Sequence, residues 1–176
     1  LAESCPADAR SRFCGVHFFN PPRYMHLVEI IPCVTSNAEM LDNLERFLVT
    51  TLGKGVIRAK DTPNFVANRV GVFSMLATIA NAEKYGVRFD VVDDLTGPRL
   101  GRPKSATFRT ADVVGLDTFA HVVKTMQDTL PEDPWHPLFK TPDWLARLIA
   151  DGALGQKTRR GIYKKEGKQT FVLDPL

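Results

Sequence analysis

The 176-residue sequence lacks the features that define several large classes of proteins. No stretch approaches eighteen consecutive apolar residues, so we expect no segment that spans a membrane. The three cysteines are an odd number with no C-x-x-C spacing, which fits neither a disulfide framework nor a metal site. The first residues include no initiating Met and no signal-peptide pattern. We therefore expect a cytoplasmic protein with reduced thiols, and we interpret the chain as a piece of a longer one.

The sequence also has no strong excess of either charge, because the formal net charge is only +3. Part of this charge comes from the basic run at 156–165. That run does not alternate basic with aromatic residues, as a nucleic-acid-binding surface would, so it favours a local contact with an anion over binding to nucleic acid. With 44% hydrophobic residues, the chain can bury a core of its own.

The first sixty residues predict three strands and one helix. Two short runs at 13–19 and 27–31 are rich in Phe, Val and Ile and are bounded by prolines, so both are typical of strands. Between 36 and 53, apolar residues recur at helical spacing up to Gly53, and 55–59 predicts a third strand. These elements are too few to close a sheet with both faces covered. They indicate the last part of a larger α/β unit.

From about residue 62 onward the predicted elements are helices. Asp61 and Pro63 form a strong helix start, because a capping residue precedes a Pro at the first helical position. We predict that this helix runs to about Tyr85 and is buried on most faces, except for a polar stripe that includes Asn64 and Asn68. The connection at 97–103 is a loop by its Gly and Pro content, and further helices are predicted at 89–97, 109–128 and 142–151.

His17 and Glu29 are the first candidates for chemistry. Each lies among apolar residues of a predicted strand, and Arg23 is the midpoint between them. If the two strands pair antiparallel about that midpoint, the two side chains lie opposite each other, with Cβ atoms within about 5.5 Å. Glu29 would then fix the tautomer of His17 and stabilise its protonated form, so that the neutral ring can act as a base. A purely structural His–carboxylate pair is the alternative.

Two asparagines and one possible metal site are the next candidates. Asn68, near the start of the predicted buried helix, could contact a substrate oxygen through its amide or tie the helix to the strand layer. Asn20 precedes a Pro and is most simply a turn residue. A metal site formed by His17, His26 and Glu29 is disfavoured, because strand alternation places His26 and Glu29 on opposite faces.

Five motifs, in this order along the chain, carry a resemblance to a known family. The sequence resembles the L-3-hydroxyacyl-CoA dehydrogenases of fatty-acid β-oxidation, in the bacterial form that is often a long multifunctional polypeptide. The motifs are GVHFFNPP at 15–22, LVEII at 27–31, DTPNFVANR at 61–69, ADVVGLDT at 111–118 and GQKTRRGIY at 155–163. The resemblance implies that residues 1–61 are the end of a Rossmann-type NAD-binding α/β domain and that residues 62–176 form an all-α C-terminal domain.

The resemblance also implies roles for individual residues. His17 is expected to be the base that takes the 3-hydroxyl proton while hydride passes to NAD, and Glu29 its partner carboxylate. Asn68 matches the asparagine that contacts the acyl group of the acyl-CoA substrate. Asn20 matches a residue near the nicotinamide end of the cofactor, and Lys157 matches a lysine near the cofactor.

The chain departs from the family pattern at two places. The G-x-G-x-x-G loop, which cradles the cofactor's pyrophosphate, does not occur in the 176 residues. For this reason we expect the isolated chain to be inactive. In the last motif, Arg159 stands where the family usually has glycine. This leaves the backbone there in question, because glycine adopts positive φ freely whereas arginine does so at a cost.

Two other functions remain open from the sequence. The apolar helix predicted at 63–85 would also suit an interaction module that self-associates and carries a vestigial His17–Glu29 pair. A relative that acts on a free hydroxy acid, without CoA, would carry the same proton-transfer residues.

Overall fold

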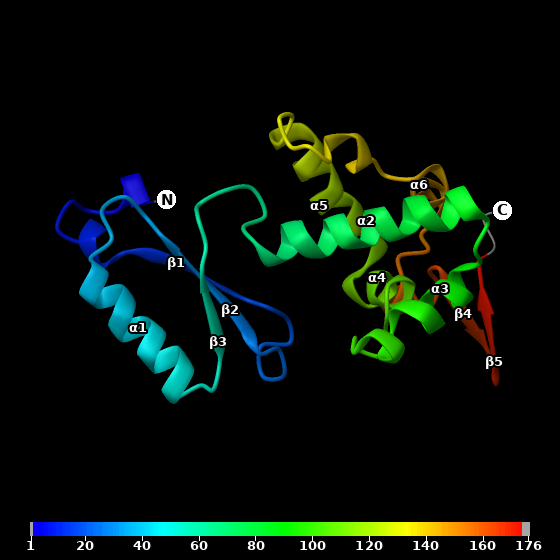
Figure 1. Ribbon diagram of the computed structural model, residues 1–176, viewed down its shortest axis with the longest axis horizontal. Helices are drawn as coiled ribbons and strands as arrows, with labels where there is room; N and C mark the ends of the chain where they lie inside the picture. The colour runs from blue at the N-terminus through cyan, green and yellow to red at the C-terminus, as the bar shows by residue number, and fades with distance from the viewer. Residues whose placement is uncertain (1, 174–176) are drawn as a thin grey trace. The chain divides into compact units, whose positions relative to one another are not determined.

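The computed structural model describes residues 2–173, which divide into two compact units. The first unit ends at Ala67 and the second begins at Asn68 (Figure 1). Each unit buries its own cluster of apolar side chains and therefore has its own core.

The first unit contains a three-stranded sheet and one helix. The strands lie in the order β1-β2-β3, with β1 antiparallel and β3 parallel to β2. A parallel pair needs a crossover connection, and here the helix α1 provides it. The predicted order of strand, strand, helix and strand is confirmed. The elements are β1 (Cys14–Phe18), β2 (Leu27–Pro32), α1 (Ala38–Thr50) and β3 (Gly55–Arg58), preceded by short 3₁₀ turns at Ala2–Ser4 and Arg10–Arg12.

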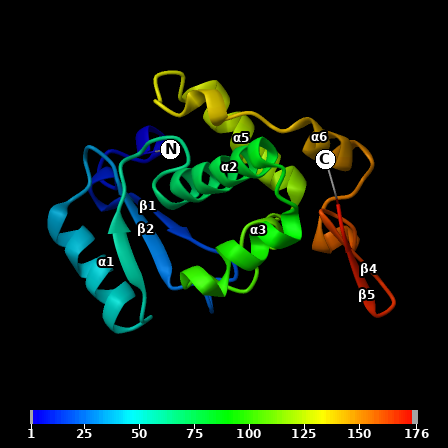
Figure 2. The same cartoon turned by 45° about the vertical axis from the view of Figure 1, so that its right-hand side comes forward.

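Helix α1 covers one face of this sheet (Figures 1 and 2). Val28 and Ile30 of β2 pack there against Leu41 and Leu48 of α1, and all four side chains are almost completely buried. Side chains alternate along a strand, so Glu29, between Val28 and Ile30, faces the opposite side of the sheet. The core thus fixes which face of β2 presents its carboxylate.

The second unit is mainly helical. Its core is centred on large side chains that come from different helices, including Phe89, Phe108 and Trp144. The helices are α2 (Ala67–Tyr85), α3 (Phe89–Thr96), α4 (Phe108–Val114), α5 (Leu116–Thr129) and α6 (Asp143–Ala150), with short 3₁₀ turns at Pro98–Leu100, His136–Leu138 and Gln156–Thr158. A hairpin of β4 (Tyr163–Glu166) and β5 (Gln169–Val172) follows them.

Helix α2 begins later than predicted. The proposed start at Asp61 and Pro63 is wrong, because Asn64 and Phe65 adopt positive φ angles of 61° and 49°, which are incompatible with a right-handed helix. The backbone N–H groups of Val66 and Ala67 instead donate to the side chain of Glu29. The carboxylate that satisfies the start of the helix therefore comes from strand β2.

Helix α2 is also less buried than predicted. Val72, Leu76 and Ile79 lie in the core of the second unit, but Val70 is 61% exposed and Tyr85 is 67% exposed. The helix is therefore packed on one side and open on the other. Its apolar residues on the open side produced the misleading pattern of a helix buried all round.

Two further predictions for the second unit need correction. The single helix predicted at 109–128 is broken into α4 and α5 at Gly115, whose φ of 98° lies outside the helical region. The β4–β5 hairpin was not predicted, because each strand has only four residues and β4 is largely charged. Gly167 supplies the positive φ of its turn.

Among residues 2–173, no helix has the length and apolar composition needed to cross a membrane. The same residues contain no group of three or more His, Cys, Asp or Glu side chains placed to hold a metal ion.

Candidate active site

The predicted register of His17 and Glu29 is confirmed. The two residues are directly opposite each other in the antiparallel β1–β2 pair. His17 Nδ1 lies 2.7 Å from Glu29 Oε2, which is a short hydrogen bond to a carboxylate. An ionised carboxylate can only accept hydrogen bonds, so Nδ1 carries the hydrogen in this pair.

Glu29 is completely buried, with 0% of its surface exposed, yet its charge is well compensated. Its second oxygen, Oε1, accepts hydrogen bonds from the backbone N–H groups of Val66 (2.9 Å) and Ala67 (2.8 Å). With His17, three donors surround the carboxylate. A buried carboxylate without such partners would destabilise the fold by several kcal/mol, because the loss of its hydration would not be compensated.

The His17 ring is held between aromatic side chains and remains accessible. Its centroid lies 4.5 Å from that of Phe19 and 5.7 Å from that of Phe65. The side chain is 29% exposed, and its Nε2 has no hydrogen-bond partner among the described residues. Because Nδ1 carries the hydrogen, neutral Nε2 is free to accept a proton from outside. The aromatic contacts and the backbone donors to Glu29 were not found from the sequence.

The other sequence-predicted residues are divided between the two units, with Asn20 in the first and Asn68 and Lys157 in the second. Asn20 is exposed, directly after β1, and precedes a cis peptide bond to Pro21. Asn68 is half-buried near the start of α2 and is the first residue of the second unit. The alternative role of Asn68 is a hydrogen bond that joins the helix to the strands. The hydrogen bonds at this place are instead those from the backbone of Val66 and Ala67 to Glu29.

Lys157 lies in the second unit, in the short turn before Arg159. Its Nζ donates to both carboxylate oxygens of Asp117, at 2.6 Å each. The hydrogen bond from Lys157, together with the positive charge of its ammonium group, lowers the pKa of Asp117. Arg159 itself has φ 57° and ψ 15°, the left-handed conformation that glycine favours. The turn thus keeps its shape although arginine occupies the position.

The residues present do not by themselves fit a complete NAD molecule. The sequence contains no G-x-G-x-x-G, and the described part of the chain forms no glycine-rich loop that opens a helix and could cradle a pyrophosphate. What the first unit does supply is a histidine hydrogen-bonded to a buried carboxylate. These residues can serve proton transfer.

Two family models match consecutive parts of the chain. Residues 1–62 match the model described as "3-hydroxyacyl-CoA dehydrogenase, NAD binding domain", and residues 65–165 match "3-hydroxyacyl-CoA dehydrogenase, C-terminal domain". The chain belongs to the 3-hydroxyacyl-CoA dehydrogenase family. NAD is therefore the cofactor of its family, and the Rossmann-type unit followed by a helical unit is the family's domain order.

Individual relatives agree with this family membership. The chain is 47% identical over 176 residues to a "Probable 3-hydroxyacyl-CoA dehydrogenase" of Bacillus subtilis, of which it covers 22%. It is 46% identical over 158 residues to a protein of the same name from Deinococcus radiodurans, of which it covers 45%. The crystal structure of (S)-3-hydroxybutyryl-CoA dehydrogenase PaaH1 from Ralstonia eutropha has a TM-score of 0.75 and 27% identity, with 89% of this chain and 53% of that chain covered. The chain thus spans less than half the length of the Bacillus subtilis relative and of the Deinococcus radiodurans relative.

Proposed function

We propose that this chain supplies the proton-transfer residues of an NAD-dependent 3-hydroxyacyl-CoA dehydrogenase, which interconverts L-3-hydroxyacyl-CoA and 3-oxoacyl-CoA in fatty-acid oxidation. The observation that carries the proposal is the hydrogen bond of 2.7 Å between His17 and fully buried Glu29 in a chain of this family. We place the protein in the cytoplasm, where its three cysteines would stay reduced.

In this proposal His17 is the general base. Its Nε2 accepts the proton of the substrate's 3-hydroxyl group, and NAD, when bound, provides the hydride acceptor. The imidazolium that forms is stabilised by the negative charge of Glu29 at Nδ1. In the reverse direction the same nitrogen returns the proton to the carbonyl oxygen. The two backbone donors keep Glu29 in place throughout.

Three other residues have supporting roles in the proposal. Asn68 would contact the acyl group through its amide, since its side chain has no hydrogen bond to another described residue. Asn20 would lie near the nicotinamide end of the cofactor, and its exposure is consistent with that role. Lys157 would lie near the cofactor. An ammonium group has three donors, so one remains while Asp117 accepts from the others.

The substrate class is tested with the longest natural polypeptide that contains this chain. We expect it to oxidise NADH with acetoacetyl-CoA at least about 100-fold faster, in kcat/KM, than with free acetoacetate, because binding energy from the remote CoA part lowers the barrier. NADH absorbance measures both rates. Faster turnover of acetoacetate would identify a dehydrogenase of free hydroxy acids and contradict the proposal. The 176-residue chain alone should show no activity above that of its own His17→Ala variant.

An apolar groove on the second unit supports self-association as an additional function. The open side of α2 and the neighbouring α3 enclose a cavity of about 520 Å³, lined by Val70, Phe73, Ala77, Tyr85 and Leu95 among others. Leu95 is 51% exposed, and an exposed apolar surface of this kind is typical of a protein interface. We propose that a second copy of the chain covers it.

This association predicts a dimer that one substitution disrupts. We expect Leu95→Asp to shift the chain to a monomer in analytical ultracentrifugation, because a carboxylate would be buried without a partner. Val113→Asp is the matched control, since Val113 is 55% exposed on α4 and does not line the groove. A wild-type chain that sediments as a monomer at high concentration would rule out the proposed dimer.

A further inference from the structure

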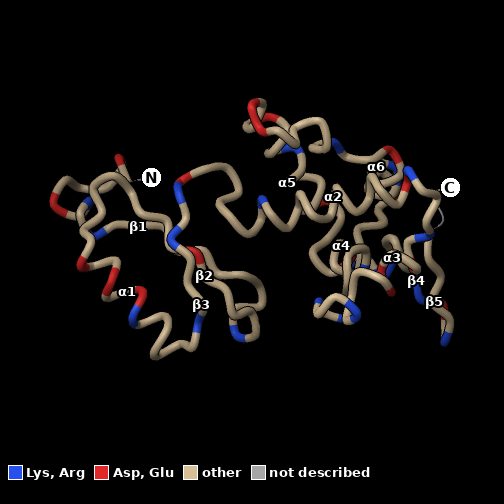
Figure 3. Tube along the Cα trace, in the orientation of Figure 1, with Lys and Arg blue, Asp and Glu red and all other residues tan. Residues whose placement is uncertain are grey.

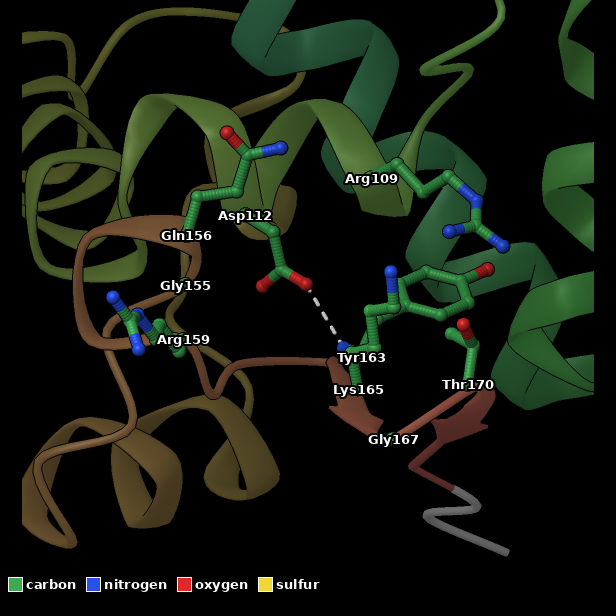
Figure 4. A pocket seen from close by; sticks show the side chains of 9 residues that line it. All are labelled: Arg109, Asp112, Gly155, Gln156, Arg159, Tyr163, Lys165, Gly167 and Thr170. Atoms are coloured by element: carbon green, nitrogen blue, oxygen red, sulfur yellow. Dashed lines mark hydrogen bonds between the residues drawn. The ribbon is translucent and has the colours of Figure 1, made fainter.

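A cavity of about 510 Å³ lies in the second unit beside the β4–β5 hairpin (Figure 4). We call it the hairpin pocket. Its walls come from α4, from the turn at Gln156–Thr158 and from the hairpin, and they include Arg109, Gln156, Arg159, Tyr163 and Lys165. None of the residues assigned above to proton transfer lines it.

The pocket carries a net positive charge, because three cations and one carboxylate line it. Arg109, Arg159 and Lys165 form no ion pair with a described side chain, whereas the next residue, Lys164, is paired with Glu166. Basic positions, blue in Figure 3, recur along the hairpin, which contains Lys164, Lys165 and Lys168. Three unpaired cations around one cavity attract an anion.

One carboxylate also lines the pocket, and the fold already uses it. Asp112 is 5% exposed, and its oxygens accept hydrogen bonds from the backbone N–H groups of Ile162 (2.9 Å) and Tyr163 (2.8 Å). The dashed line in Figure 4 marks the second of these. Asp112 therefore supports the turn into the hairpin, and its charge also acts on the Arg109 guanidinium.

The cations are spread along the pocket. In Figure 4, Arg159 lies on one side and Arg109 with Tyr163 on the other, with Asp112 and Lys165 between them. The Arg109 guanidinium carbon is 3.9 Å from the centroid of the Tyr163 ring. This stacking orients the guanidinium while leaving its N–H donors at the edge, where a ligand oxygen can accept from them. Such spacing suits a ligand with several separated negative oxygens.

Arg159 is the least expected residue of the pocket. Its backbone is in the left-handed region, at φ 57° and ψ 15°, where an arginine is disfavoured relative to glycine. The turn would be relaxed with glycine at this position. If arginine at this position has a function, the side chain therefore provides it, because the backbone would favour glycine. Residues with a strained backbone of this kind occur at ligand sites.

We propose that the hairpin pocket binds a phosphate ester with at least two negative charges. Phosphate oxygens accept several charge-assisted hydrogen bonds at once, which matches two guanidinium groups and one ammonium group. The cavity volume of about 510 Å³ is in the range of small-molecule sites. The ester could come from the nucleotide end of CoA or from a free phosphorylated metabolite. The proposal does not depend on the dehydrogenase function.

The test is calorimetric titration of the 176-residue chain with three probes: CoA, ADP and inorganic pyrophosphate. We expect at least one to bind with a Kd of about 1 mM or below. Binding of CoA alone would assign the pocket to the nucleotide end of CoA. Binding of CoA and ADP without pyrophosphate would also assign it to a nucleotide end, whereas binding of pyrophosphate as tightly as CoA would assign it to the phosphate groups of a free metabolite. If every probe has a Kd above about 1 mM, the proposal is wrong.

Two matched pairs of variants locate the site. Arg159→Gly should weaken binding about 10-fold or more while leaving the unfolding temperature unchanged or higher, because glycine relieves the backbone. Arg160→Ala removes the same charge one residue away, outside the pocket lining, and should bind within about 2-fold of wild type.

Lys165→Gln and Lys164→Gln form the second pair, because neighbouring residues of a strand point to opposite faces. Only Lys165→Gln should weaken binding. Equal losses within each pair would show general attraction by net charge and overturn the proposal. His17→Gln should bind the probes as wild type does, which keeps this test separate from that of the dehydrogenase.

Discussion

His17→Gln should lower kcat for the NADH-dependent reduction of acetoacetyl-CoA by roughly 10²–10⁴-fold in the longest natural polypeptide that contains this chain. Glutamine keeps a polar side chain of similar size but cannot take up a proton near neutral pH. The unfolding temperature should change little, because His17 is partly exposed and Glu29 keeps its two backbone donors. Steady-state kinetics and thermal unfolding of the same preparation measure both quantities.

His26→Gln is the control for this prediction, since His26 is exposed just before β2 and has no assigned role. Glu29→Gln adds a second readout. Its amide oxygen can still accept from Val66 and Ala67, but its NH₂ group would face His17 Nδ1 and move the ring hydrogen to Nε2. We expect a lower kcat in this variant too. Full activity in both His17 and Glu29 variants would make the pair structural and favour the interaction module.

Asp93→Ala should destabilise the second unit by about 3–5 kcal/mol, the largest stability effect we expect in this chain. Asp93 is 6% exposed and accepts from the backbone N–H groups of Thr107, Phe108 and Arg109, at 3.0, 2.7 and 3.0 Å. It also accepts from the Tyr163 hydroxyl at 2.8 Å. Alanine would leave these donors at the start of α4 without partners.

The Tyr163 hydroxyl depends on the same carboxylate. Burial, followed by the negative charge of Asp93, raises the pKa of Tyr163, so the hydroxyl stays protonated and continues to donate. Asp93→Asn keeps one accepting oxygen and should lose less stability than Asp93→Ala. Both changes act on the contact that joins α3 to α4 and to the hairpin.

The Asp93 prediction is checked by following tryptophan fluorescence during thermal unfolding, because the two Trp residues, Trp135 and Trp144, both lie in the second unit. Asp94→Ala is the matched control. The Asp94 side chain is 66% exposed and pairs with Arg99 at the surface, so its loss should matter little, by about 0.5 kcal/mol or less. Similar unfolding temperatures for the Asp93 and Asp94 variants would contradict the assigned role of Asp93.

Several elements could be predicted because their signal is local. The alternation of side chains in β1 and β2, together with a connection centred on Arg23, was enough to place His17 opposite Glu29. The helical spacing of apolar residues between 36 and 53 predicted α1, and the bounds of α3 and α6 differ from the predicted ones by about a residue. In each case, neighbouring residues contain the whole pattern.

The features that could not be predicted depend on partners distant in sequence. The start of α2 is determined by Glu29, whose Oε1 bonds to residues 37 and 38 positions away. The hairpin is joined to the helices by Asp112, through bonds spanning 50 and 51 positions. The apolar neighbours of Glu29 indicate that it is buried, but no local pattern shows which distant backbone N–H groups either carboxylate binds.

The sequence by itself indicated the family of the chain, the order of its first three strands and most helices, and, for an antiparallel β1–β2 pair, the position of His17 opposite Glu29. Only the tertiary structure decided that Glu29 also holds the start of α2, that Gly115 separates two helices, and that Arg159 adopts a left-handed backbone. The physical reason is that the spacing of apolar residues shows which face of a helix or strand is buried. The partners of a buried carboxylate are backbone N–H groups that come near it only in the folded chain.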